Sequence, residues 1–252
     1  MIKAVLFDLG GTVHLCTNSE PRKLWFAQRL ISRLEEYGIR LDATPEALAK
    51  QLDINAEIYK KEAETTLREL DPAIVWADYY LRGQGLSREA LAPVAEELSF
   101  LYDYERVCNL RRPGLIATMD ALRAQGLRLG MISNIISRSI VPHFVMEYGL
   151  DRYFECVLSS AGTGIRKPDP AIFRLAEQQM GLAPSELAYV GDTLSRDVRG
   201  ARNAGWRLVI QIYNPGAARR DAGLAEQGWK ADYNIEALEE IPAIIAKENA
   251  VC

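Results

Sequence analysis

The chain has 252 residues, with 30 Lys and Arg against 34 Asp and Glu, for a formal charge of −4. This balance excludes a general nucleic-acid binder, because no excess of positive charge is available to follow a phosphate backbone. No apolar run approaches the roughly 18 residues of a membrane span, and no export signal opens the chain. We therefore expect a cytoplasmic globular protein without a membrane partner. Its four scattered cysteines are expected to remain free thiols: Cys16, Cys108, Cys156 and Cys252.

Short apolar runs alternate with helical patterns through most of the chain. Near-continuous apolar runs of this length are typical of strands covered on both faces, as in a parallel sheet. Strands are predicted at residues 2–7, 127–132, 155–158, 187–190, 207–212 and 231–234. Helices are predicted at residues 113–125, 170–180 and 195–204, each followed by a glycine suited to end a helix. This alternation predicts an α/β fold with a doubly wound, parallel-sheet, Rossmann-like core.

From about residue 18 to residue 104 the sequence no longer alternates between strand and helix patterns. The segment predicts three to five amphipathic helices and no strand. We interpret its aromatic stripe, Trp76, Tyr79 and Tyr80, as core packing. We expect residues 1–16 and 108–252 to form the α/β core domain. Residues 17–107 would then form a helical cap domain inserted into it.

Polar side chains stand where three of the apolar runs end. Asp8, Ser133 and Asp192 hold these positions, and the carboxyl ends of parallel strands share one crevice. The carboxylates of Asp8 and Asp192 would repel each other there unless a cation lay between them, and hard oxygen ligands suit Mg²⁺. Asp197 is close enough in sequence to orient that metal or its waters. Asp192 and Asp197 could instead only cap the helix that begins near Ser195.

Lys167 lies in a loop that opens a helix. Beside a metal and a nucleophilic carboxylate, its ammonium group would neutralise the charge of a phosphoryl group during transfer. The hydroxyl of Ser133 could donate a hydrogen bond to a nonbridging phosphoryl oxygen. Taken singly, either residue is more often an ordinary solvated or packed side chain.

Four segments in order resemble the motifs of the haloacid dehalogenase superfamily: residues 8–12, 132–134, 166–170 and 191–197. The resemblance implies that Asp8 is a nucleophile that forms an aspartyl-phosphate, held by Ser133 and Lys167. It also implies that Asp8, Asp192 and the carbonyl of Gly10 bind Mg²⁺, with support from Asp197. We further expect Gly11 and Asn134 to contact the substrate.

The sequence departs from this pattern at Gly10, where phosphatases of the family usually carry a general acid and base Asp. One interpretation is a phosphatase whose substrate has a good leaving group or whose proton comes from another residue, with His14 nearest. A second is a metal-independent 2-haloacid dehalogenase, because halide leaves without a proton. Asn134 suits that branch, whereas the retained Asp192 disfavours it.

Two further alternatives remain open. A catalytically weak module could bind a phosphorylated ligand without turning it over. Hydrolysis of a carbon–phosphorus bond would need a cap lysine for a Schiff base, and the cap offers Lys23, Lys50, Lys60 and Lys61.

The cap is expected to select the substrate, because its closure over the core forms the pocket wall. Its size favours a small phosphorylated metabolite, and the glycine pattern indicates no organic cofactor. The oligomeric state cannot be read from the pattern. Candidate cap contacts are Arg22, Arg29, Arg68, Tyr79, Tyr80 and Arg82.

Overall fold

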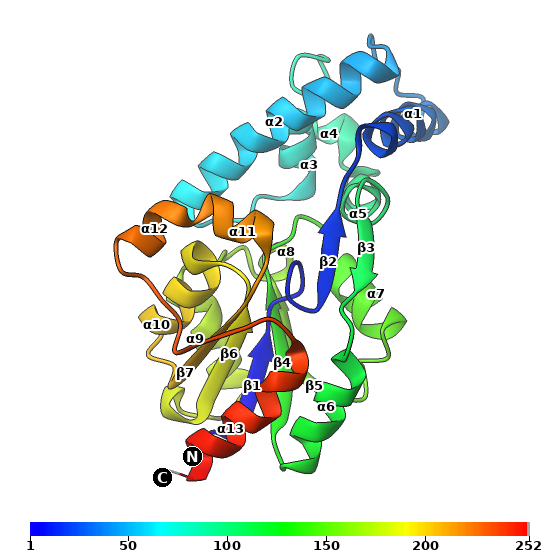
Figure 1. The fold of residues 1–252 in the computed structure, drawn as a ribbon. Coiled ribbons are helices and arrows are strands. Elements are labelled where there is room, and N and C mark those ends of the chain that lie inside the picture. The colour runs from blue at the N-terminus through cyan, green and yellow to red at the C-terminus, as the bar shows by residue number, and fades with distance from the viewer. Residues whose placement is uncertain (251–252) are drawn as a thin grey trace.

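The computed structural model describes residues 1–250 and contains a six-stranded parallel sheet (Figure 1). The strand order is β5-β4-β1-β6-β7-β8, which confirms the predicted doubly wound core. Each predicted strand overlaps an observed one. The strands are β1 Ala4–Phe7, β4 Arg128–Ser133, β5 Phe154–Ser159, β6 Leu187–Gly191, β7 Leu208–Ile212 and β8 Tyr233–Ile235.

The central strands read as apolar runs because both of their faces are covered. In β1, Val5 and Phe7 pack into one hydrophobic cluster, while Ala4 and Leu6 pack into another on the opposite face. Helices α6 (Leu115–Ala124), α7 (Ile140–Glu147) and α13 (Ile241–Ala250) contribute to the first cluster. Helices α9 (Pro170–Met180) and α10 (Arg199–Asn203) contribute to the second. The sheet is thus sandwiched between two helical layers.

The helices of the core agree with the sequence in part. The pattern at 170–180 matches α9, and the pattern at 113–125 contains α6. The pattern at 195–204 is a π-helical turn, η3 (Leu194–Val198), followed by α10. The sequence patterns did not predict α7 or the C-terminal helices. The remaining elements of the core are α8 Ser160–Thr163, η2 Pro184–Glu186, α11 Pro215–Arg220, α12 Ala222–Glu226 and η4 Leu238–Glu240.

Residues 18–104 form helices and no strand, as expected, and lie above the carboxyl edge of the sheet (Figure 1). They have a hydrophobic cluster of their own, in which Trp76 and Tyr80 are buried. The indole Nε1 of Trp76 donates to Ser99 Oγ at 2.9 Å. The aromatic stripe is therefore packing, as interpreted. The helices are α1 Glu20–Glu36, α2 Pro45–Thr66, α3 Pro72–Ile74, η1 Val75–Tyr80, α4 Arg88–Leu91 and α5 Ala95–Glu105.

A two-stranded antiparallel ribbon, β2 (His14–Thr17) and β3 (Cys108–Arg111), joins this helical layer to the sheet. The sequence did not predict the ribbon, because most of its side chains are exposed and carry no apolar pattern. The expected junction at residues 16–17 lies within β2, and the one at residues 107–108 lies at the start of β3. We propose the ribbon as the boundary between core and cap.

A second tie between the two layers runs through Glu69, in the loop after α2. Its backbone N–H donates to the carbonyl of Gly164 at 3.1 Å, and the N–H of Arg166 donates to the carbonyl of Leu67 at 3.0 Å. The buried Glu69 carboxylate pairs with the Arg166 guanidinium and accepts from Ser160 Oγ at 2.5 Å. The helical layer is therefore bound directly to the loop that leads into α9.

A third tie lies at the start of α5. Glu96 Oε1 accepts from the hydroxyls of Ser137 and Ser139, each at 2.8 Å. Arg138 also pairs with Asp71 at 2.8 Å. These polar contacts hold α5 and the start of α3 against the loop that follows β4.

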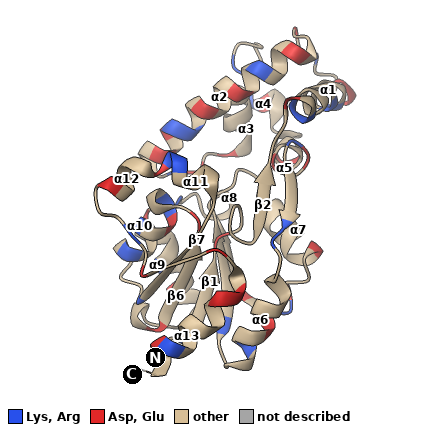
Figure 2. Ribbon diagram, in the orientation of Figure 1, with Lys and Arg blue, Asp and Glu red and all other residues tan. Residues whose placement is uncertain are grey.

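The described cysteines Cys16, Cys108 and Cys156 are free thiols, as expected, while Cys252 lies outside the described residues. Across residues 1–250 no helix combines the length and the apolar character needed to cross a membrane. Figure 2 shows acidic and basic segments alternating along α2 rather than forming a stripe of one sign.

Candidate active site

Three polar residues meet at the carboxyl edge of the sheet because β4, β1 and β6 are neighbours. Asp8 follows β1, Ser133 ends β4, and Asp192 follows β6. The N–H of Asp8 donates to the carbonyl of Val190 at 2.9 Å, which continues the ladder to β6. This is the place where the strand order reverses, the usual position of a binding crevice in open α/β sheets.

Lys167 comes to the same place from the loop before α9. Its buried Nζ lies 2.7 Å from Asp8 Oδ1, 2.7 Å from Asp197 Oδ1 and 2.9 Å from the hydroxyl of Tyr189. Burial alone would lower the pKa of this ammonium, but the charges of Asp197 and Asp8 raise it above its ordinary value. The group therefore remains a cation between two carboxylates.

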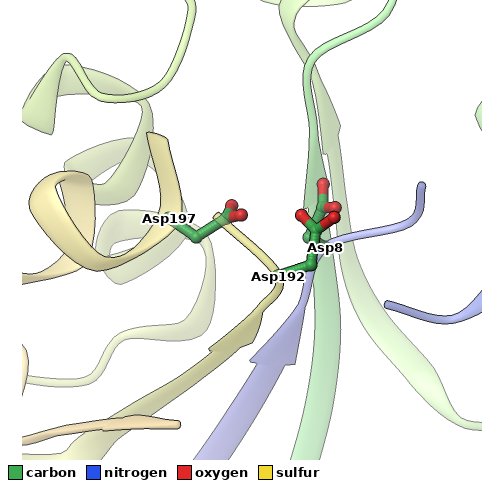
Figure 3. A group of neighbouring side chains, drawn as sticks. All are labelled: Asp8, Asp192 and Asp197. Carbon is green, nitrogen blue, oxygen red and sulfur yellow. The ribbon is translucent and has the colours of Figure 1, made fainter. Parts of the chain in front are cut away.

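The carboxylates of Asp8, Asp192 and Asp197 each place an oxygen within 4.8 Å of the others, and Figure 3 shows them clustered. Burial, reinforced by the charges of Asp197 and Asp8, raises the pKa of Asp192 to about 7. Burial also raises the pKa of Asp8. So much negative charge in a buried space favours a bound cation.

The carboxylates differ in how many of their oxygens already accept a hydrogen bond or pair with a cation. Both oxygens of Asp197 are engaged, Oδ1 with Lys167 and Oδ2 with the hydroxyl of Thr193 at 2.5 Å. Asp192 Oδ2 accepts from Asn214 Nδ2 at 2.7 Å, whereas its buried Oδ1 has no hydrogen-bond partner within residues 1–250. An orphaned carboxylate oxygen beside Asp8 fits a hard divalent cation such as Mg²⁺.

Gly11 shapes the loop after β1. Its φ is +88°, and a Cβ there would lie 2.1 Å from Asp192 Oδ2, so only glycine allows this approach. Its N–H donates to the carbonyl of His14 at 2.7 Å, and its carbonyl accepts from Arg112 Nη2 at 2.6 Å. The N–H thus has a partner within the loop, and the carbonyl has one in the residue that follows β3. Gly11 nevertheless lines the cavity over the carboxylates, so its contact with substrate stays a prediction.

Asn134 positions the loop of Lys167. Its Oδ1 accepts from the Lys167 N–H, and its Nδ2 donates to the Lys167 carbonyl, each at 2.9 Å. This two-point contact fixes the backbone beside the ammonium group. Asn134 also lines the cavity, so its expected contact with substrate stays a prediction.

His14 is buried at the start of β2. Its ring packs edge-on against Phe144, and Nδ1 lies 3.1 Å from the hydroxyl of Tyr148. Burial lowers its pKa to about 4, so the imidazole is neutral near pH 7. A neutral, packed imidazole is poorly suited to act as a general acid.

A family model described as haloacid dehalogenase-like hydrolase matches residues 2–205. The chain belongs to this family. It is 30% identical over 211 residues to the glyceraldehyde 3-phosphate phosphatase of Methanopyrus kandleri, with 83% of each chain covered.

Solved structures of this hydrolase family also resemble the chain. A HAD phosphatase from Thermococcus onnurineus matches with a TM-score of 0.65 and 25% identity, covering 97% of this chain and 98% of that one. A 2-haloacid dehalogenase from Pseudomonas syringae matches with a TM-score of 0.64 and 25% identity, covering 98% and 99%. Because both activities occur among these structures, the side chains of this hydrolase must distinguish them.

A cavity of about 360 Å³ opens over the carboxylates. Its core wall includes Ser133, Gly10, Arg196 and Arg220, and its cap wall includes Asp103. The six cap residues expected to contact substrate do not line it, nor do the four cap lysines considered for a Schiff base. The substrate would instead meet the last turn of α5 and the ribbon.

Three residues of the site were missed from sequence. Arg196 stands inside the motif at 191–197, and its charge stabilises the ionised forms of Asp8 and Asp197. The motif contains Arg196, but the sequence pattern gave this residue no role. Asn214 and Asp103 come from distant segments, and no local pattern marks either of them.

Proposed function

We propose that this hydrolase is a Mg²⁺-dependent phosphatase that transfers the phosphoryl group of a small phosphomonoester to Asp8 and then to water. The observation that carries this proposal is the buried Asp192 Oδ1 without a hydrogen-bond partner in residues 1–250, beside Asp8. Asp8, Asp192 and the carbonyl of Gly10 would hold the cation. When bound, the cation would neutralise negative charge on the phosphoryl oxygens.

Each side chain of the site has a separate role in the phosphoryl transfer. Lys167 holds Asp8 Oδ1 at 2.7 Å, which leaves the second oxygen of Asp8 to attack phosphorus. The Lys167 ammonium balances the charge that gathers on the phosphoryl group, and Ser133 donates its hydroxyl to a nonbridging oxygen. Asp197, fixed by Thr193, keeps the ammonium in place. Water then releases phosphate from the aspartyl-phosphate.

A 2-haloacid dehalogenase is the second candidate. Gly10 favours it, because expulsion of halide needs no acid, and so does the likeness to the Pseudomonas syringae dehalogenase. Asp192 argues against it. A dehalogenase without metal would retain a buried carboxyl next to its nucleophile, and with no cation its ionisation would be opposed by burial and by the charges of Asp197 and Asp8.

The cavity supports a small substrate. Its volume of about 360 Å³ lies near the lower end of the roughly 300–1,000 Å³ of small-molecule sites. Arg196 and Arg220 place positive charge on its wall, which favours an anionic ligand. The phosphatase relative is named for glyceraldehyde 3-phosphate, and we propose a phosphorylated metabolite of similar size.

The decisive experiment measures two reactions on one preparation. Hydrolysis of p-nitrophenyl phosphate that requires Mg²⁺ and stops with EDTA supports the phosphatase. Chloride release from 2-chloropropionate in EDTA supports the dehalogenase. Neither reaction, together with measurable binding of phosphate esters, supports a binding module. A screen of phosphorylated metabolites then identifies the substrate.

A further inference from the structure

The proposed phosphatase lacks a proton donor at position 10, and this inference rests on that function. An alkoxide is a poor leaving group, and a positioned acid typically contributes about 10²–10⁴ in rate. His14 is neutral near pH 7. Burial, with the charge of Asp8, raises the pKa of Cys16 to about 12, so this thiol is a weak acid. The proton must come from another group.

Asp103 faces the same cavity from the opposite side. It lies in the last turn of α5, in the layer above the carboxyl edge of the sheet (Figure 1). Its Oδ2 atom is buried and has no hydrogen-bond partner within residues 1–250. Attack by Asp8 in line with the leaving oxygen directs that oxygen away from the strand ends and toward the cap. Asp103 therefore lies on the side where the leaving group departs.

Asp103 also lies on the side of the missing residue. A Cβ at Gly10 would approach only Cys16 Sγ, at 4.0 Å, so this part of the cavity is open. Gly10, Cys16 and Asp103 all line this cavity, so Asp103 borders the same opening. Position 10 and Asp103 thus flank one space.

The surroundings of Asp103 favour its protonated form. Burial raises the pKa of this carboxyl well above its ordinary value. Glu69, in the loop after α2, and Glu96, on α5 itself, raise it further. The backbone N–H of Ser137 and the guanidinium of Arg166 act in the opposite direction without reversing the rise. This rise favours the protonated carboxyl, which is the form that can donate.

We propose that Asp103 is the general acid and base that replaces the residue absent at position 10. As the bond from Asp8 to phosphorus forms and the ester P–O bond breaks, the Asp103 proton moves to the leaving oxygen and releases an alcohol. Asp103 becomes a carboxylate. It then takes a proton from the water that attacks the aspartyl-phosphate, which frees phosphate and restores both carboxyl groups.

The test compares two leaving groups in the full-length protein with Mg²⁺. The substrates are p-nitrophenyl phosphate, whose phenolate leaves without a proton, and the alkyl phosphomonoester that the wild type turns over best in the screen above. Asp103→Asn should lower kcat/KM for the alkyl ester by about 10²–10⁴ and for p-nitrophenyl phosphate by less than about tenfold. Adding Gly10→Asp to this variant should recover at least about tenfold on the alkyl ester.

Glu105→Gln is the matched control, because Glu105 lies on the same helix and faces Arg29 rather than the cavity. It should leave both rates unchanged. Equal losses on both substrates for a folded Asp103→Asn variant, or no loss on the alkyl ester, would overturn the role of Asp103. If the wild type hydrolyses neither ester, the proposed phosphatase function fails as well.

A second measurement needs no variant. Across aryl and alkyl phosphates of rising leaving-group pKa, an enzyme with an internal acid should show only a shallow fall in kcat/KM. A steep fall in the wild type would mean that no group protonates the leaving oxygen. That result would overturn the proposal even if Asp103→Asn did not fold.

Discussion

The metal-free protein should become more stable when one of its own active-site carboxylates is neutralised. Asp192 is buried beside Asp8 and Asp197. Repulsion among these carboxylates lowers the stability of the folded protein, and a bound cation would relieve it. Asp192→Asn keeps the shape and can keep the hydrogen bond from Asn214 while removing the charge. We expect the variant to lose Mg²⁺ binding and turnover yet resist unfolding better in EDTA.

The magnitude follows from the pKa of Asp192. A rise from the ordinary 3.8 to about 7 corresponds to about 4 kcal/mol, at ~1.4 kcal/mol per pKa unit. For a carboxyl with a raised pKa, folded-state stability is greatest below pH 3.8 and is lost as pH rises toward 7. The variant should therefore gain up to about 4 kcal/mol over the wild type at pH 8, and less than half of that at pH 5.

The assay is urea unfolding at pH 5 and pH 8, in EDTA and again in Mg²⁺. In Mg²⁺ the wild type should recover stability through binding, whereas the variant should not respond. Asp197→Asn is the contrasting control, because Lys167 and Arg196 lower the pKa of Asp197 despite its burial, and its loss should destabilise the protein. Our account of the charge cluster would be refuted if Asp192→Asn were destabilising at pH 8, or if its effect did not change with pH.

The other predictions concern single groups. Asp8→Asn should abolish turnover in a folded protein; residual phosphatase activity within about tenfold of the wild type would remove Asp8 from the nucleophile role. Glu69→Ala leaves the Arg166 guanidinium buried without its carboxylate and should lower the free energy of unfolding by about 3–5 kcal/mol in urea; a loss under about 1 kcal/mol would contradict this. His14 has a pKa of about 4 against 6.5 when unfolded, so its contribution to stability is full above pH 6.5 and falls as pH drops toward 4. Between pH 7 and pH 4.5 the wild type should therefore lose roughly 2–3 kcal/mol more than His14→Gln; equal losses would show that the imidazole is not buried in its neutral form.

The sequence predicted the sheet well because its central strands are buried on both faces. The strand β1 has four buried side chains in succession, and neither an exposed loop nor an amphipathic helix produces such a run. The ribbon strands β2 and β3 were not predicted, because a mostly exposed strand of four residues has no apolar pattern that distinguishes it from a loop. The prediction was therefore strongest where burial is complete on both faces.

The residues of the candidate site were also predictable only in part from the sequence. Asp8, Ser133 and Asp192 were found because each directly follows or ends a strand, and strand order brings them together. Gly11 and Asn134 line the same cavity, but the hydrogen bonds that they make depend on loop conformations that no local pattern encodes. Asp103 enters the cavity only through packing between the cap and the core.

The contact between the loop at residues 67–69 and the loop at 164–166 has a mechanical consequence. Any swing of α1–α5 away from the sheet must part the hydrogen bond from Arg166 to Leu67, one residue before the ammonium that steadies Asp8. Opening of the cavity to a ligand is therefore coupled to the position of the segment that leads into Lys167. Opening would thus release one contact of the segment before Lys167, while Asn134 would continue to fix the lysine from the core.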